Sequence, residues 1–161
     1  VIGFSAGGHL CSTVSTHFAK PDETSTDPIA QTSSRPDFAI LAYPVIGFDK
    51  PYTHRGSQKN LLGPNPDPKL VQLLSNEEQV SAQTPPTFLF HTVADKAVPV
   101  ENSIEYFKAC RKHGVSAEMH LFPNGRHGLG LARSVPGAAQ WPGLCEQWLR
   151  GLGVVTRAEE Q

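Results

Sequence analysis

Three short apolar runs divide the chain, and the segments between them carry apolar residues at helical spacing. The runs cover residues 38–43 (FAILAY), 87–91 (TFLFH) and 117–122 (AEMHLF). The first two are almost continuously apolar, which is typical of strands buried on both faces. The third alternates between apolar and polar residues, which favours an edge strand. Residues 1–2 (VI) are consistent with the end of a further buried strand.

Two helices are predicted before the second run. Ala6, Leu10 and Val14 recur every four residues, and this pattern stops before residues 20–21 (KP). Residues 67–74 predict a short helix with three leucines on its apolar side. These are Leu70, Leu73 and Leu74. We interpret the long, proline-rich connection at residues 47–86 as an excursion over the edge of the sheet that forms one wall of a pocket, not as a separate domain.

Two further helices follow the second run. The first is expected to begin near Asn102, with Glu105 as its capping-box partner, and to end at Gly114. Its predicted apolar face carries Ile104, Phe107 and Cys110. The last helix has the clearest amphipathic stripe in the chain. The stripe consists of Trp141, Leu144, Cys145, Trp148, Leu149 and Leu152. Strands that alternate with helices predict an α/β fold with a mostly parallel sheet covered by helices.

Composition narrows the possible partners. The 161 residues suffice for about one domain. The formal net charge is −1 and Lys and Arg form no run, so nucleic acid is not an expected partner. No apolar stretch approaches the about 18 residues of a membrane helix, so a membrane is not expected either. The three cysteines, Cys11, Cys110 and Cys145, are widely spaced without a C-x-x-C pair, which favours core positions over a zinc site or disulfides. No metal or other cofactor is predicted.

The pattern G-x-S-x-G carries the strongest chemical signal. Residues 3–7 read GFSAG, directly after the first predicted strand and before a helix. A nucleophilic serine raised above a sheet needs a sharp turn from strand to helix, with small residues two positions away on either side. Ser5 is then the candidate nucleophile, and the N–H of Ala6 is placed to bind an oxyanion at the positive end of the helix. The alternative is a glycine-rich turn in which Ser5 only caps the helix.

Two residues complete a candidate catalytic triad. In hydrolases built on such a turn the chain order is serine, acid, histidine. Asp95 follows the second apolar run and His127 follows the third, so both are expected at the carboxyl edge of a parallel sheet. The other histidines favour capping, core or exposed positions, although His54 is kept as a residue that could line a substrate pocket. The predicted triad is therefore Ser5, Asp95 and His127.

Three stretches, GFSAGGHL, HTVADKAVPVENS and NGRHGLG, in this order, resemble the α/β-hydrolase superfamily, most closely its acetylesterase and xylan-deacetylase-like branch. The resemblance implies that residues 1–153 are the C-terminal half of an α/β-hydrolase domain, followed by a tail at residues 154–161. It implies a serine hydrolase that cleaves carboxylic esters through an acyl-enzyme, with small acyl groups such as acetyl on a carbohydrate. The expected partner is thus a small-molecule or carbohydrate ester.

The resemblance also leaves alternatives open. Family members carry a glycine-rich loop upstream of the serine that supplies a second oxyanion donor, and no residues precede Val1 here. We therefore interpret the chain as part of a longer protein and expect these 161 residues alone to be inactive. A prolyl-oligopeptidase-like serine peptidase shares the order of the triad, and a non-catalytic α/β binding module would keep the turn without its chemistry. A dienelactone-hydrolase-like enzyme is disfavoured because that group has cysteine at the position of Ser5. No prediction is made for compartment or oligomeric state.

Overall fold

The structure, a computed structural model, describes residues 1–155 and contains one parallel sheet. Its strands are β1 (Ile2–Phe4), β2 (Ala39–Ala42), β3 (Thr87–Thr92) and β4 (Ala117–Phe122). They lie side by side in the order β1-β2-β3-β4, and all three neighbouring pairs are parallel. The predicted α/β class and the three apolar runs are confirmed. Of the predicted tail, residues 156–161 lie outside the described residues.

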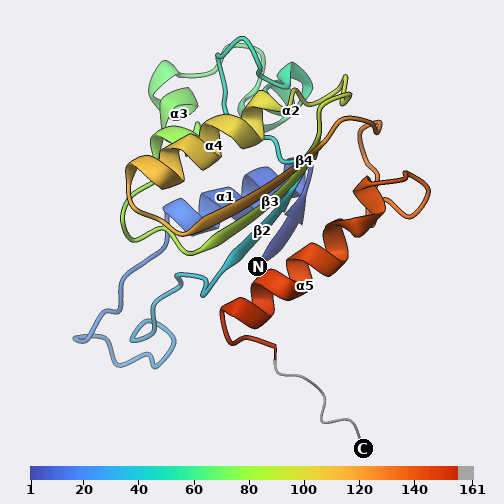
Figure 1. Cartoon of the computed structure of the whole chain (residues 1–161). Coiled ribbons are helices and arrows are strands. Elements are labelled where there is room, and N and C mark those ends of the chain that lie inside the picture. Colours follow the sequence, from blue (N-terminus) through green and yellow to red (C-terminus); the bar gives the residue numbers. More distant parts are fainter. Residues whose placement is uncertain (156–161) are drawn as a thin grey trace, which may run out of the picture.

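Helices cover both faces of the sheet (Figure 1). One face carries α1 (Ala6–Thr16) and α4 (Glu101–Lys112), and the other carries α5 (Trp141–Gly151). Alternate residues of the central strands point to opposite faces. Leu41 and Leu89 pack in the cluster that includes Tyr106 of α4, whereas Phe88 and Phe90 pack against the tryptophans of α5. Every residue of β2 and β3 is therefore buried, as the continuously apolar runs predict.

The stripe on α5 is largely confirmed. Trp141, Cys145 and Trp148 are buried, and the Trp141 ring stacks on Phe90 with ring centroids 4.9 Å apart. Leu152 lies beyond the end of the helix and is 38% exposed, so it does not extend the buried face. The three cysteines are free and buried, as expected for core positions.

The predicted apolar face of α1 is wrong. Leu10 is 65% exposed and Val14 is also exposed, while the buried side chains of this helix include Cys11, Ser12 and Ser15. The cause is close packing between the helix and the chain beneath it. A Cβ atom at Gly8 would lie 2.6 Å from Cβ of Pro44, nearer than non-bonded carbon atoms in proteins approach. Only small side chains fit where α1 lies against Pro44, and Leu10 and Val14 point outward. His9, the large buried side chain of this helix, stacks on Phe48 instead.

Three other local predictions need correction. On α3 (Pro68–Leu73) the buried side chain is Val71, which packs with Val45 and Phe48, whereas Leu70 and Leu73 are exposed. On α4 the N-cap is Val100, not Asn102. Ile2 is 55% exposed, because β1 has a neighbour on one side only within the described residues.

The predictions for the end of α4 and for the edge position of β4 agree with the structure. α4 ends at Lys112, and Gly114, just beyond its C-cap His113, has a φ of +70° that suits glycine, close to the expected end. β4 lies at an edge of the sheet, and all its residues are half-buried. The excursion between β2 and β3 contains α2 (Arg55–Leu62), a helix that the apolar pattern does not reveal because only Gln58 is buried. Figure 1 shows this helix near the carboxyl ends of the strands.

Candidate active site

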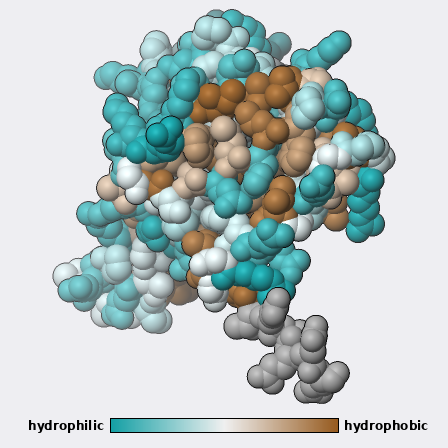
Figure 2. Space-filling view, viewed as in Figure 1, coloured by the Kyte–Doolittle hydropathy of each residue, from teal (hydrophilic) through white to brown (hydrophobic). Residues whose placement is uncertain are grey.

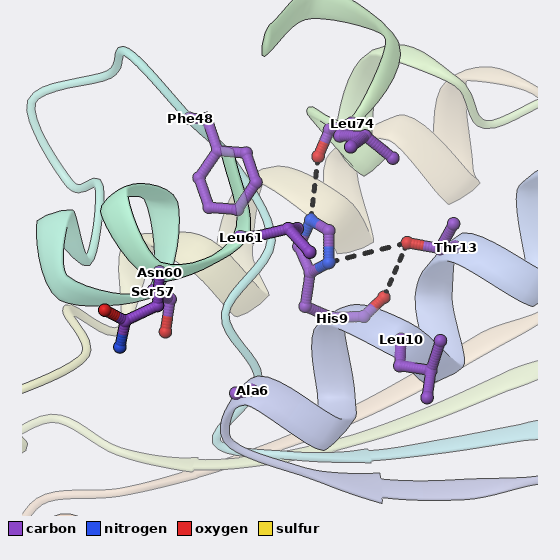
Figure 3. A pocket seen from close by; sticks show the side chains of 9 residues that line it. All are labelled: Ala6, His9, Leu10, Thr13, Phe48, Ser57, Asn60, Leu61 and Leu74. Atoms are coloured by element: carbon purple, nitrogen blue, oxygen red, sulfur yellow. Dashed lines mark hydrogen bonds between the residues drawn. The ribbon is translucent and has the colours of Figure 1, made fainter. Parts of the chain in front are cut away.

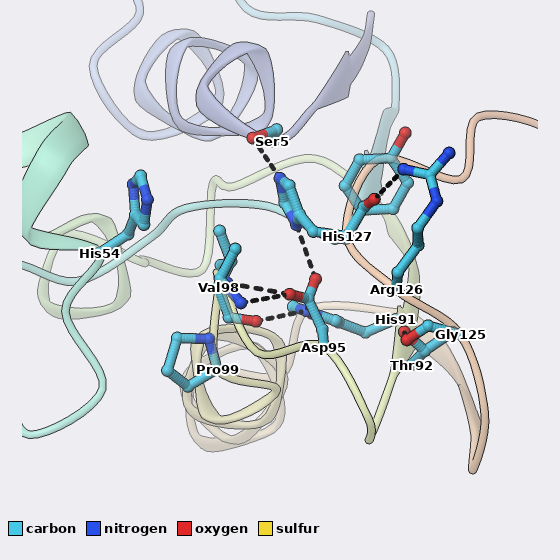
Figure 4. Close-up of polar contacts among 12 residues, drawn as sticks. Ser5, His54, His91, Thr92, Asp95, Val98, Pro99, Gly125, Arg126 and His127 are labelled. Carbon is cyan, nitrogen blue, oxygen red and sulfur yellow. Dashed lines mark hydrogen bonds and ion pairs between the residues drawn. The ribbon is translucent and has the colours of Figure 1, made fainter.

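The carboxyl edge of the sheet brings the three predicted residues together. Ser5 follows β1, Asp95 follows β3, and His127 follows β4, and the carboxyl ends of parallel strands share one edge. The Ser5 Oγ lies 2.7 Å from Nε2 of His127. Nδ1 of the same imidazole lies 2.6 Å from Oδ2 of Asp95. Figure 4 shows the resulting chain of hydrogen bonds from hydroxyl to imidazole to carboxylate.

The turn at Ser5 has the strained geometry that a raised nucleophile requires. Its φ is +54°, a value that costs a non-glycine residue about 1–3 kcal/mol. A Cβ atom at Gly3 would lie 2.2 Å from the carbonyl oxygen of Gly7, so glycine at position 3 lets the helix start directly above the strand. Ser5 occupies the N-cap position of α1, but its side chain makes no capping hydrogen bond. Its hydroxyl is directed at His127 instead, which disfavours the interpretation of Ser5 as a simple helix cap.

The backbone N–H of Ala6 makes no hydrogen bond among the described residues. The Ser5 carbonyl accepts hydrogen bonds from the N–H groups of Gly8, His9 and Val45. Among residues 1–155, by contrast, no hydrogen bond is found from the Ala6 N–H. This donor stands at the positive end of the α1 dipole, beside the Ser5 hydroxyl. Its position fits the predicted oxyanion donor.

Asp95 is held as a carboxylate inside the protein. Its side chain is 0% exposed. Burial by itself would raise the pKa of Asp95, but hydrogen bonds from His91, His127 and the backbone N–H groups of Val98 and Ala97 hold that pKa well below its usual range. The two backbone groups donate to Oδ1 at 3.0 and 2.9 Å. Oδ2 therefore remains for the histidines.

The loop that carries His127 is fixed from two sides. The Thr92 hydroxyl donates to the carbonyl of Gly125 at 3.0 Å, and the Tyr43 hydroxyl accepts from the N–H of Gly130 at 2.9 Å. The Tyr43 ring also packs in a T-shaped arrangement with the imidazole of His127, with ring centroids 5.1 Å apart. Tyr43 itself has a φ of +38°, so it sits in a sharp turn after β2. The pattern of the sequence does not single out this tyrosine.

His54 caps a helix, one of the roles expected for the histidines outside the triad. Its Nδ1 accepts a hydrogen bond from the N–H of Ser57 at 3.2 Å and lies 2.8 Å from the Ser57 hydroxyl. The imidazole therefore caps α2, a task more often performed by Ser, Thr, Asp or Asn. Figure 4 places His54 on the opposite side of the Ser5–His127 pair from Arg126. It is not among the residues that line the nearby cavity.

A cavity of about 430 Å³ is lined in part by Ala6, the residue that follows Ser5 in the chain. Its lining residues, drawn in Figure 3, are Ala6, His9, Leu10, Thr13, Phe48, Ser57, Asn60, Leu61 and Leu74. Five of them belong to the excursion at residues 47–86 and confirm that this segment forms a pocket wall. Another hollow, of about 480 Å³, is lined by Lys96, Arg126 and His127, among others. Figure 2 shows apolar side chains in the middle of the visible face, within mainly hydrophilic surroundings.

Neither a metal cluster nor a membrane helix is found in the described part of the chain. Residues 1–155 contain no group of three or more His, Cys, Asp or Glu side chains arranged to hold a metal ion. None of their helices has the length and apolar character needed to cross a membrane.

Sequence reasoning missed the groups that support Asp95. His91, on β3, is 0% exposed and hydrogen-bonded on both ring nitrogens, so the expectation of a core position is confirmed. It also lies 3.4 Å from Oδ2 of Asp95, a contact that the expectation did not include. Asn102, expected to cap α4, instead accepts from the N–H groups of Ile46 and Gly47 and joins the pocket wall to α4. The one available signal was the position of His91 four residues before the acid, at the end of a buried strand.

A parallel sheet with a serine on a strained strand-to-helix turn, followed in the chain by an acid and a histidine on the same edge, defines the α/β-hydrolase fold class. Comparison with known proteins agrees. The sequence profile of the BD-FAE family matches residues 1–109, and the chain belongs to this family.

Relatives and solved structures share most of the chain. It is 41% identical to endo-1,4-beta-xylanase B of Butyrivibrio fibrisolvens over 132 aligned residues, and this alignment covers 82% of this chain and 20% of that protein. It is 36% identical over 157 residues to acetylxylan esterase of Xylanibacter ruminicola, covering 95% and 29%. The crystal structure of an acetyl ester-xyloside bifunctional hydrolase from Caldicellulosiruptor lactoaceticus superposes with a TM-score of 0.93 at 52% identity, covering 97% of this chain and 57% of that one. The chain thus spans under a third of the curated relatives it matches.

Proposed function

We propose that this chain carries the catalytic triad of a serine hydrolase that cleaves carboxylic esters, with Ser5 as nucleophile, His127 as base and Asp95 as acid. The observation that carries the proposal is the pair of hydrogen-bond distances, 2.7 Å from Ser5 Oγ to His127 Nε2 and 2.6 Å from His127 Nδ1 to Asp95 Oδ2. These distances lie within the range that nucleophile and base need for proton transfer.

In the proposed reaction, each step is assigned to one of these groups. His127 takes the proton of Ser5, and the Ser5 oxygen attacks the carbonyl carbon of the ester. The Ala6 N–H binds the negative oxygen of the tetrahedral intermediate. His127 then gives its proton to the leaving alcohol, and an acyl-serine remains. Water, activated by the same imidazole, releases the acid and restores the Ser5 hydroxyl. Asp95 stabilises the imidazolium that forms in both halves of the reaction.

The proposed substrate is an acetyl ester of a carbohydrate. Support comes from the names of similar proteins, which include an acetylxylan esterase and an acetyl ester-xyloside hydrolase. Within residues 1–155 we identify one oxyanion donor, Ala6, and one missing donor costs such enzymes about 10²–10³ in rate. We therefore expect residues 1–161 alone to turn over an acetyl ester far more slowly than the protein in its full natural length.

The test uses the protein in its full natural length and the Ser5→Ala variant. With 4-nitrophenyl acetate and with acetylated xylo-oligosaccharides, Ser5→Ala is expected to lose at least about 10³-fold in kcat, because the nucleophile is removed. A fluorophosphonate probe should label Ser5 in the natural protein. If Ser5→Ala keeps most of the activity, Ser5 is not the nucleophile. A natural protein that neither hydrolyses the esters nor reacts with the probe would instead favour a non-catalytic binding module.

A further inference from the structure

A buried imidazole stands behind the acid of the triad. His91 and Ser103 are both 0% exposed, and neither takes part in the proposed chemistry. His91 lies on β3, four residues before Asp95, and Ser103 lies in the first turn of α4. Figure 4 shows the His91 ring beside the Asp95 carboxylate, on the far side from Ser5.

The hydrogen-bond partners of His91 define which nitrogen carries its proton. Nε2 lies 3.0 Å from the carbonyl oxygen of Val98, which can only accept, so Nε2 must donate. Nδ1 lies 2.8 Å from the hydroxyl of Ser103 and, in the neutral ring, accepts from it. The Nε2–H group therefore points toward the Val98 carbonyl, and Oδ2 of Asp95 lies 3.4 Å from the same nitrogen.

These contacts bind Val98, in the loop after Asp95, through both its N–H and its carbonyl group. The Val98 N–H donates to Oδ1 of Asp95, while the Val98 carbonyl accepts from His91. One residue of the loop is thus tied to the carboxylate on one side and to the buried imidazole on the other. Oδ2 receives the Nδ1–H of His127 at 2.6 Å from one direction and faces the positive end of the His91 Nε2–H dipole from another.

We propose that His91, oriented by Ser103, is a positioning residue that aims the Asp95 carboxylate at His127. The inference rests on the proposed function, because it concerns the acid of the same triad. A small rotation of the carboxylate would lengthen the bond from Asp95 to His127 and leave the imidazole free to turn away from Ser5. Such a misplacement of about 1 Å can cost an enzyme on the order of 10²-fold in rate.

Two substitutions of His91, by side chains of similar size, distinguish an effect on the position of Asp95 from an effect on folding. The amide nitrogen of glutamine reaches the place of Nε2, so His91→Gln keeps a donor toward Val98 and Asp95. The amide of asparagine reaches only the place of Nδ1, so His91→Asn keeps a polar contact with Ser103 and loses the donor toward the acid. His113→Gln, at the exposed end of α4, is the matched control.

The measurement is kcat and KM for 4-nitrophenyl acetate in the protein of full natural length, together with melting temperature. We expect His91→Asn to lower kcat roughly 10- to 100-fold with little change in KM, and His91→Gln to keep kcat within about threefold. The downfield proton signal of the His127–Asp95 hydrogen bond should persist in His91→Gln and be lost in His91→Asn. Should His91→Asn fail to fold, Ser103→Ala carries the test, with a lowered kcat, an unchanged KM and rescue by Ser103→Thr.

Equal values of kcat in His91→Asn and His91→Gln, or losses that follow melting temperature alone, would overturn the inference while leaving the proposed function intact. Wild-type kcat in Ser103→Ala would also count against it. A wild-type protein that neither turns over the ester nor reacts with a fluorophosphonate would refute the proposed function, and this inference with it.

Discussion

Replacing Asp95 with asparagine changes one oxygen to an NH2 group, and the structure determines where that group must go. Oδ1 accepts from the N–H groups of Ala97 and Val98, so an amide nitrogen cannot take its place. The NH2 group is therefore forced into the position of Oδ2, facing Nδ1 of His127 and the Nε2–H of His91. There it donates to His127, which must move its proton from Nδ1 to Nε2. The imidazole then has no lone pair for the proton of Ser5.

The expected cost is large. In a serine–histidine–acid triad a wrong histidine tautomer lowers kcat by about 10⁴, which corresponds to about 5 kcal/mol of transition-state stabilisation. We expect a loss of this order for Asp95→Asn at neutral pH, with KM changed little, in steady-state assays with 4-nitrophenyl acetate on the protein in its full natural length. Asp37→Asn, at an exposed position, is the control and should match the wild type. A loss below about tenfold for Asp95→Asn would refute the proposed role of the carboxylate.

Two other predictions follow from the same edge of the sheet. Tyr43→Phe removes the acceptor for the Gly130 N–H and should lower kcat by about tenfold or less at constant KM, since a net hydrogen bond is worth about 1 kcal/mol; unchanged kcat would show that this bond does not hold the loop. Folding lowers the pKa of Asp95, so the ionised carboxylate stabilises the folded protein. This contribution to the free energy of unfolding is complete above the pKa of an unfolded aspartate, about 3.9, and is lost as pH falls below it. The free energy of unfolding, measured with urea, should therefore fall more steeply below about pH 5 in the wild type than in Asp95→Asn. Parallel curves of this free energy against pH would contradict the lowered pKa of Asp95.

The strands and the last helix could be predicted because burial leaves a direct trace in the sequence. β2 and β3 are covered on both faces, so nearly every residue is apolar. α5 packs on the sheet through one face only, and its tryptophans recur at helical spacing. The candidate triad could be predicted because chain order and strand ends together constrain where Ser5, Asp95 and His127 can lie.

The failures share a different cause, which is contact between segments far apart in the chain. Gly8 of α1 lies against Pro44, so only small residues fit at that contact, and an apolar pattern does not reveal such closeness. α2 depends on a cap by His54 more than on burial, so its apolar signal is weak. His91 looks like any core histidine in the sequence, and its contact with Asp95 arises only when the chain turns after β3.

The most direct test of the account is to trap the acyl-enzyme. The protein in its full natural length is mixed with an acetyl ester, and the reaction is stopped with acid before it reaches a steady state. The protein is then digested for mass spectrometry. The account predicts an acetyl group on the peptide that contains Ser5, and none in the Ser5→Ala variant. Acetylation of a different residue, or full turnover without any acetylated Ser5, would contradict it.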